Sequence, residues 1–312
     1  MKNIVSTITS CYKAKPYLKL FLEQLPLQTY FKNLEIVLAH NEPEKEEIRL
    51  IENFQTQYPN KIKHIIFKKV TPLGVSWNEC IKTACGDFLT IWNIDDLRTP
   101  KSIESQSNLL SNNLNTNIVY GNYIVVDSFG KTTGKLIEHK NIPDSEFARS
   151  MVWGPFFMFR KSLLKKTGYF DEQFKSALDL DFCIRASTHG EAKFLDENLG
   201  YFLNAGKGLS TRPDSLNNAE RTTIELRYGI YDKIDYNKMP KATTNYSIPY
   251  LLQNNKWKHV SHFISKYELF IENKKKQKLI AGIKSFYKNH KRQYSRITGI
   301  KKFIKKLIKK FL

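Results

Sequence analysis

Short runs rich in β-branched residues alternate with amphipathic segments along the first 92 residues, and this alternation restricts the folds open to the chain. Residues 3–9 predict a strand, and residues 16–28 place large apolar side chains at helical spacing behind a proline. The same pattern predicts further strands over residues 34–39, 63–67 and 87–92, and further helices over residues 43–58 and 76–84. Strands that alternate with helices of this length form a parallel sheet. We therefore expect an α/β fold with a mostly parallel sheet and with helices on both faces.

The pattern is less regular after residue 100. It predicts a helix over residues 101–110, a strand over 117–126, a hairpin partner around 135–138 and a helix over 178–188. Beyond about residue 215 the sequence becomes helical and polar in pattern, and we find no internal repeat. We therefore expect a first domain over residues 1–215 and a helical extension over residues 216–298.

The net charge of +20 is concentrated at the C-terminal end of the chain. Residues 251–312 contain 18 of the 50 Lys and Arg residues but only two of the 30 Asp and Glu residues. The first 250 residues are therefore close to neutral, as in an ordinary globular domain. The cationic character belongs to the tail.

Cysteine usage and hydropathy give expectations about location. The four cysteines are scattered without a CxxC pair, and we find neither a secretory leader nor a run of about 18 apolar residues. We expect free thiols in a reducing compartment and a cytoplasmic protein.

Residues 300–312 (IKKFIKKLIKKFL) place apolar side chains on one helical face and six lysines on the other. A buried large apolar side chain contributes roughly 1.5–3 kcal/mol, and a lysine near an anionic surface about 1 kcal/mol. We expect residues 299–312 to form a basic amphipathic helix that holds the protein on the inner face of an anionic membrane. The stripe can instead pack on the protein's own domain or on a second copy. Nucleic acid is the third alternative, but we expect no nucleic-acid partner, because a phosphate backbone makes no use of the apolar stripe.

Asp95 and Asp96 follow the apolar run of residues 88–92 after only two intervening residues. Adjacent carboxylates repel each other unless a cation lies between them, and Mg²⁺ and Mn²⁺ are commonly held by one or two carboxylates together with substrate phosphates. Ligands of parallel α/β sheets bind beyond the carboxyl ends of the strands. The position therefore favours a metal site over the alternative, in which the pair caps a helix near Pro100.

Several longer segments carry a family resemblance in a consistent order. They are VSTITSCYKAKPYLKLFLEQLPLQTY, LEIVLAHNE, GVSWNECIKTACGDFLTIWNIDD, FFMFRKSLLKKTGYFDEQF and LDLDFCIRAS. Together they resemble glycosyltransferase family 2, the inverting enzymes with the GT-A fold, over about residues 3–210. The resemblance implies a nucleotide-sugar-binding half over residues 1–98 and an acceptor and catalytic half over residues 99–215.

The resemblance also implies roles for individual residues on the donor side. It places Asp95 and Asp96 in the metal motif that takes Mn²⁺ or Mg²⁺. The residues expected at the nucleotide are Thr9, Ser10, Tyr12, Asn41, Asn78 and Asp95. Asn41 stands where the family usually has an aspartate that contacts uracil, and an amide can still bond a base edge. Trp77 stands where many members have an arginine, and packing of the helix face accounts for it better than base stacking.

On the acceptor side, Asp179 aligns with the family's catalytic aspartate, with Asp181 as its competitor. An inverting transfer needs a base that removes the proton of the acceptor hydroxyl. An Asp at the start of a helix also serves as an N-cap, which is the alternative for both residues. Lys207 and Arg212 are candidate diphosphate contacts or else solvated loop cations. The aromatic residues around Trp153 either stack on an acceptor sugar or belong to the core.

The expected activity is therefore metal-dependent transfer of a sugar, with inversion, from a nucleotide-sugar donor to a hydroxyl of a glycan or lipid-linked acceptor. UDP is the expected nucleotide. Synthesis of surface polysaccharide or glycolipid would suit a membrane-bound enzyme. The departures from the family pattern keep open a second interpretation, a membrane-associated protein that binds nucleotide sugars without turnover.

Overall fold

The computed structural model describes residues 4–141, 153–172, 174–187 and 189–212, and from there only 215–217, 220–221, 224, 250–253 and 256–259. The chain divides into two compact units. The first comprises Met1–Phe147 and Met151–Pro213, and the second Ala148–Ser150 and Asp214–Leu312. The predicted tail helix over residues 299–312 lies outside the described residues.

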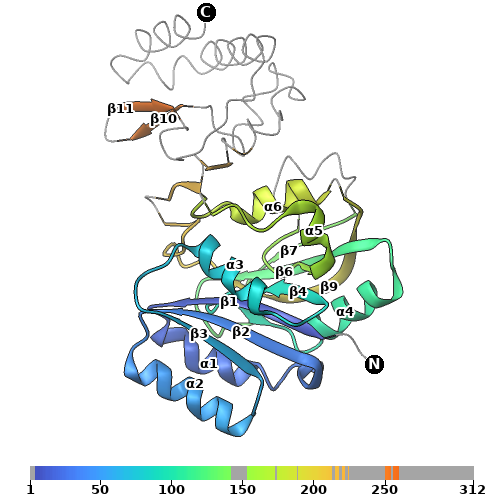
Figure 1. Ribbon diagram of the computed structural model, residues 1–312. Coiled ribbons are helices and arrows are strands. Elements are labelled where there is room, and N and C mark those ends of the chain that lie inside the picture. Colours follow the sequence, from blue (N-terminus) through green and yellow to red (C-terminus); the bar gives the residue numbers. More distant parts are fainter. Residues whose placement is uncertain are drawn as a thin grey trace, which may run out of the picture. The chain divides into compact units, whose positions relative to one another are not determined.

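Four parallel strands with intervening helices form the first half of the first unit (Figure 1). The strands lie in the order β3-β2-β1-β4. Their bounds are β1 Val5–Tyr12, β2 Leu34–Asn41, β3 Ile62–Phe67 and β4 Phe88–Ile91, and those of the helices are α1 Lys15–Gln24, α2 Lys45–Gln57 and α3 Leu73–Thr83. A short 3-10 helix, Phe31–Asn33, precedes β2. The alternation predicted from the sequence is confirmed.

The second half adds antiparallel pairings, so that the whole nine-stranded sheet is mixed. Beyond β4 the order continues β8-β6-β9-β5, and β7 pairs with β6. The bounds are β5 Leu97–Arg98, α4 Ser102–Asn112, β6 Thr116–Val126, β7 Lys135–Ile137, β8 Met158–Arg160, α5 Leu164–Thr167, α6 Leu178–Ser187 and β9 Glu191–Leu203, with a 3-10 turn at Lys161–Leu163 before α5. The predicted helices at 101–110 and 178–188 and the predicted hairpin are confirmed.

Helices cover both faces of this sheet (Figure 1). Apolar residues of α1, α2 and α4, such as Phe21, Ile51 and Leu110, join one buried cluster with β1, β2, β4 and β6. On the other face α3 packs on β1 and β2, and the ring of Phe182 in α6 contacts Phe157 and Phe159 around β8. Each layer buries the apolar stripe of its helices, which is the main source of stability in such a fold.

The first two strands are longer than the sequence predicts. Their parallel pairing continues without interruption to the pair Tyr12 and Asn41. Ladder hydrogen bonds to a neighbouring strand outweigh the weak strand propensity of residues such as Ser10 and Asn41. Thr9 and Asn41 therefore lie within strands and not in the loops that follow them.

The described part of the second unit includes an antiparallel hairpin of β10 (Tyr250–Gln253) and β11 (Lys256–His259). Most of the helical extension predicted over residues 216–298 lies outside the described residues, and these two strands are the exception to helix within its described part.

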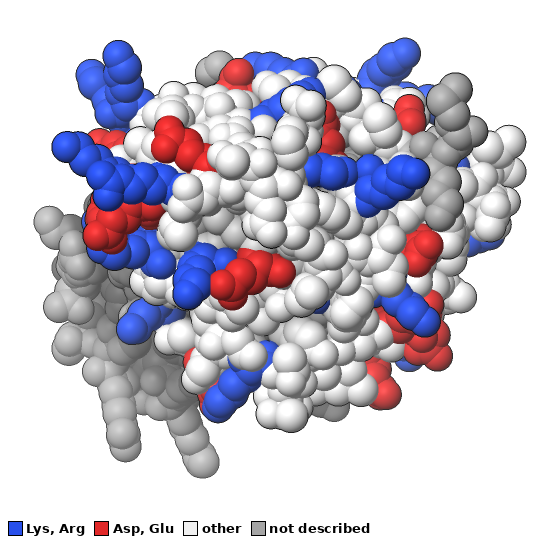
Figure 2. Space-filling view, turned by 90° about the horizontal axis from the view of Figure 1, so that it is seen from below, with Lys and Arg blue, Asp and Glu red and all other residues white. Residues whose placement is uncertain are grey.

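Charges of both signs are interspersed on the face seen in Figure 2. Lys15 of α1, for example, pairs with Glu44 and Glu46 at the start of α2. Such exposed pairs contribute little stability. In the described part of the chain no helix is long and apolar enough to cross a membrane.

Candidate active site at the carboxyl edge of the sheet

The carboxyl ends of β1, β2 and β4 meet at one edge of the sheet. Tyr12 is the register partner of Asn41, and Ile8 that of Ile91 at the end of β4. The N–H of Trp92 donates to the carbonyl oxygen of Ile8 at 3.1 Å, so the segment after β4 starts beside β1. The structure thus brings Tyr12, Asn41 and the carboxylate pair to the edge where ligands of α/β sheets bind.

The side chain of Asp96 is buried, with only 2% of the residue exposed. Its carboxylate accepts hydrogen bonds from the Asn93 side chain and from the N–H of Leu203, both at 3.0 Å. Burial, and then the neighbouring charge of Asp95, raises the pKa of Asp96 to about 8. Burial also raises the pKa of the half-buried Asp95. A divalent cation would relieve the repulsion between these carboxylates.

Arg98 is a buried cation that the sequence did not reveal. It is 1% exposed, and its guanidinium donates to Gln106 at 3.1 Å and to the carbonyl of Ile91 at 3.0 Å. The guanidinium also lies over the ring of Phe156, 5.2 Å from its centroid. Burial lowers the pKa of Arg98 to about 9, although Asp96 opposes this shift. Arg98 thus supplies a buried positive charge that acts on Asp96.

The side chains predicted to meet the nucleotide divide between the two faces of β1. Successive residues of a strand point to opposite faces. Thr9 shares the face of Cys11, which lies in the cluster with α1 and α2, and Thr9 is completely buried. Ser10 and Tyr12 share the opposite face, and Tyr12 is 41% exposed. Ser10 and Tyr12 are therefore open to a ligand, whereas Thr9 points into the core.

Asn41 lies on the α3 side of the sheet and is buried. Its amide donates to the hydroxyl of Ser76 in α3 at 3.3 Å and accepts from the N–H of Thr71 at 2.7 Å. These two bonds tie the end of β2 to the segment that leads into α3. Asn41 therefore shapes the wall of the predicted nucleoside site.

One face of α3 docks against the segment that precedes α6. The Asn78 amide donates to the carbonyl of Phe170 and to Glu172, both at 2.9 Å, and accepts from the N–H of Phe170 at 3.1 Å. Trp77 packs edge-on against Phe170, with ring centroids 5.1 Å apart. A Cβ at Gly74 would come within 2.6 Å of Leu178. This face of α3 thus fixes the position of the chain that leads into Asp179. Packing against Phe170 accounts for Trp77.

Asp179 and Asp181 occupy different environments in the first turn of α6. Asp181 is completely buried, and its carboxylate is paired with Arg185 at 2.7 Å. Asp179 is half-buried, and its carboxylate accepts the N–H of Leu180 at 2.8 Å. Of the two candidates for the base, Asp179 is the one that a substrate can reach.

Lys207 and Arg212 lie exposed on the segment that follows β9. The Leu203 N–H bond to Asp96 anchors the start of this segment beside the carboxylate pair. Trp153, by contrast, is completely buried, which assigns it to the core.

Tyr123 and Phe202 were not singled out from the sequence. Burial, and then the charge of Asp96, raises the pKa of the half-buried Tyr123. The ring of Tyr123 stacks on His139 at 5.6 Å and meets Phe202 edge-on at 6.2 Å. Tyr120, Phe194 and Tyr201 lie in the same two strands, so only the fold distinguishes this pair.

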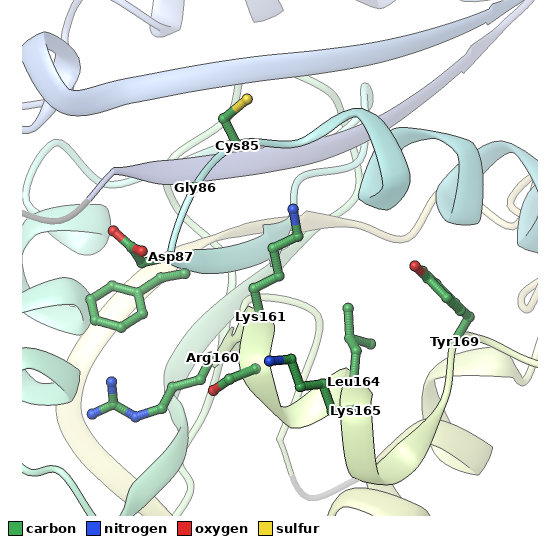
Figure 3. Close-up of a pocket in the computed structure, with 10 residues that line it drawn as sticks. Cys85, Gly86, Asp87, Arg160, Lys161, Leu164, Lys165 and Tyr169 are labelled. Carbon is green, nitrogen blue, oxygen red and sulfur yellow. The ribbon is translucent and has the colours of Figure 1, made fainter.

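A cavity of about 680 Å³ lies elsewhere, at the amino end of β4 (Figure 3). It is lined by Cys85, Gly86, Asp87, Phe88, Arg160, Lys161, Ser162, Leu164, Lys165 and Tyr169. Two of its cations are already used by backbone carbonyls, because Arg160 bonds Leu110 and Thr116 and Lys161 bonds Ala84. The cavity opens at the opposite end of β4 from Asp95 and Asp96.

The model of the glycosyl transferase family 2 matches residues 6–168, just over half of the chain. The chain therefore belongs to this family. An uncharacterized glycosyltransferase of Methanocaldococcus jannaschii is 27% identical over 192 residues, which cover 59% of this chain and 64% of that protein. EpsE of Bacillus subtilis, a proposed glycosyltransferase, is 28% identical over 133 residues, which cover 43% of this chain and 48% of EpsE. The chain thus spans less than two thirds of either relative.

Solved structures agree with the fold. The structure of S. aureus TarS with UDP-GlcNAc aligns over 95% of this chain and 74% of its own, with a TM-score of 0.60 and 16% identity. The mannosyltransferase PcManGT of Pyrobaculum calidifontis, with GDP-Man and Mn²⁺, aligns over 74% of this chain and 65% of its own, with a TM-score of 0.55 and 13% identity. At such identities the likeness concerns the GT-A fold alone.

Proposed function

We propose that this protein is a metal-dependent, inverting glycosyltransferase that moves a sugar from a UDP-linked donor to a hydroxyl of a glycan or lipid-linked acceptor. Family membership supports the class of reaction. The observation that carries the proposal is the carboxylate pair at the carboxyl edge, with the pKa of Asp96 raised to about 8 by burial and by Asp95. The UDP-GlcNAc bound to TarS supports the class of donor.

Asp95 and Asp96 suit Mn²⁺ or Mg²⁺, because both ions prefer oxygen ligands and carboxylates. Asp95 is the more exposed of the two and would bind the ion directly, with Asp96 behind it. Asp95 and Asp96 would hold the ion, whose charge would stabilise the departing diphosphate. The Mn²⁺ in the PcManGT structure belongs to a protein of the same fold and supports this assignment.

The chain's own side chains supply the remaining steps. Ser10 and Tyr12 line the nucleoside side of the edge, with Asn41 shaping its wall. Lys207 and Arg212 lie on the segment anchored beside Asp96 and would bind the diphosphate. Asp179 accepts the proton of the acceptor hydroxyl as that oxygen attacks the anomeric carbon.

Tyr123 and Phe202 form the acceptor side. Aromatic rings offer a flat apolar surface together with, in tyrosine, a polar hydroxyl. Tyr123 lies close enough to Asp96 for the carboxylate to raise the pKa of its phenol. An acceptor sugar resting on this surface would lie next to the metal-bound donor.

A screen of nucleotide sugars with Mn²⁺ or Mg²⁺ tests the proposal, with wild type compared with the double variant Asp95→Ala/Asp96→Ala. We expect metal-dependent turnover of one donor that the double variant loses. Donor binding without any turnover would contradict the proposal and favour a non-catalytic sugar-nucleotide-binding protein.

We further propose that the acceptor is made at the inner membrane face, in surface polysaccharide or glycolipid synthesis, with residues 299–312 as the anchor. The apolar and lysine faces of that segment support this. Full-length protein should float with anionic liposomes, and a 1–298 truncation should not. Equal flotation of the truncation would refute the anchor.

A further inference from the structure

A buried polar cluster lies behind the predicted nucleotide edge. Cys11 of β1 and His40 of β2 are register partners and share the face of the sheet that α1 and α2 cover. Glu47, in the first turn of α2, reaches the same point. The thiol sulfur, an imidazole nitrogen and a carboxylate oxygen lie within 4.8 Å of one another, and all three side chains are buried.

The cluster is incomplete as an ordinary hydrogen-bond network. His40 is completely buried, and among the described residues its Nε2 atom has no partner in good hydrogen-bond geometry; the nearest carboxylate oxygen, of Glu47, lies 3.4 Å away. Buried polar atoms without partners are costly and rare. The unpartnered nitrogen points to the space that it shares with the thiol and the carboxylate.

Further contacts fix the orientation of His40 and Glu47. The other nitrogen of His40, Nδ1, lies 3.2 Å from Nε2 of His64. The Glu47 carboxylate accepts the N–H of Ala14 at 3.1 Å and that of Glu44 at 2.8 Å. Histidines that bind metals are typically oriented by a bond to their other nitrogen, and carboxylate ligands by further hydrogen bonds.

We propose that Cys11, His40 and Glu47 bind a zinc ion. Sulfur, nitrogen and oxygen ligands together favour Zn²⁺ over Mg²⁺ or Mn²⁺. Tetrahedral zinc, with bonds of about 2.0–2.3 Å, needs ligand atoms about 3.3–3.8 Å apart, so side chains already within 4.8 Å require a contraction of about 1 Å. A thiolate and a carboxylate together neutralise the ion, and one water molecule would complete the four ligands of tetrahedral zinc.

Zinc binds the neutral imidazole of a histidine and the thiolate of a cysteine. The thiol of Cys11 therefore loses its proton when the ion binds. Binding forms the zinc–sulfur bond and releases this proton to solvent.

The site would join three elements at the nucleotide edge without taking part in transfer. Cys11 lies between Ser10 and Tyr12, His40 directly precedes Asn41, and Glu47 fixes the start of α2. The ion would hold these strand ends in register. The proposal does not depend on the transferase activity.

The test uses full-length protein expressed without a polyhistidine tag in zinc-supplemented medium. Elemental analysis should find stoichiometric zinc in wild type and a loss of zinc in Cys11→Ser and in His40→Asn. Cys80→Ser is the matched control, because Cys80 is also buried but lies outside the cluster. We expect the control to retain zinc and all folded variants to give the same circular dichroism.

Cobalt gives a second readout that needs no variant to fold. Wild-type protein stripped with a chelator and titrated with Co²⁺ should develop a thiolate-to-cobalt charge-transfer band, and zinc should remove it. Wild-type protein that contains no zinc and develops no such band overturns the proposal. So does zinc that both Cys11→Ser and His40→Asn retain. Turnover with Mn²⁺ is measured separately, so the two proposals fail independently.

Discussion

Replacing Asn78 with alanine distinguishes two roles for this residue. Asn78 either links α3 to the segment that precedes α6 or binds the nucleotide. The Asn78 amide makes three hydrogen bonds to Phe170 and Glu172, and its side chain is buried. Asn78→Ala leaves the backbone N–H and C=O of Phe170 without these partners. Each such loss costs about 1–3 kcal/mol, so we expect the free energy of unfolding to fall by about 2–5 kcal/mol.

The same substitution should affect catalysis in a particular way. Loosening residues 170–172 lets the start of α6, and with it the Asp179 carboxylate, shift. Misplacement of a reacting group by about 1 Å can cost on the order of a hundredfold in rate. We expect a lower kcat in turnover assays and an unchanged Kd for the donor by calorimetry. Urea denaturation measures the loss of stability. Glu79→Ala is the control on the same helix, because Glu79 makes only an exposed pair with Lys82. A weakened donor Kd with unchanged stability would refute the role as a link and favour direct nucleotide binding.

Three further predictions concern the carboxylate pair and its surroundings. The pKa of Asp96 is about 8 in the folded protein, and an unfolded Asp titrates near 3.9, so the folded state retains a proton that the unfolded state releases. Metal-free protein should therefore lose thermal stability as the pH rises from about 4 to about 8. If Tm falls as steeply with pH in Asp96→Asn, titration of Asp96 is not the cause. Arg98→Ala should lower the free energy of unfolding by about 2–5 kcal/mol, since it leaves a cavity and unpaired acceptors, and a change below about 0.5 kcal/mol would contradict its burial. Tyr123→Ala should raise the KM for the acceptor and leave the Kd for the donor unchanged, whereas a change in donor Kd alone would assign Tyr123 to the nucleotide.

The first half of the fold follows from local pattern because its strands and helices alternate with clear periodicity. In the second half, local pattern predicted α4, β6, β7 and α6 but not β5, β8 and β9. β5 has only two residues, and β9 mixes charged, apolar and glycine residues, so neither has a period-2 signal of its own. Both form because neighbouring strands offer them hydrogen bonds, which is information outside the segment.

The candidate site divides in the same way. The carboxylate pair and Asp179 are recognisable from local sequence. The family resemblance implied that Thr9 lies at the nucleotide, but the first strand continues beyond its predicted end at residue 9 to Tyr12, and alternation turns the Thr9 side chain inward. The partners of Asn78 lie 92 and 94 residues away in the sequence, and no single-sequence pattern reveals such pairs. Arg98 was missed because arginine is normally exposed.

Asp179→Asn tests the central claim most directly, with Asp181→Asn as its companion variant. We predict that Asp179→Asn abolishes turnover of the nucleotide sugar while donor binding and Tm stay at wild-type values, because only the proton acceptor is lost. Asp181→Asn should instead lower Tm, because it breaks the buried pair with Arg185. Full turnover in Asp179→Asn would contradict the account.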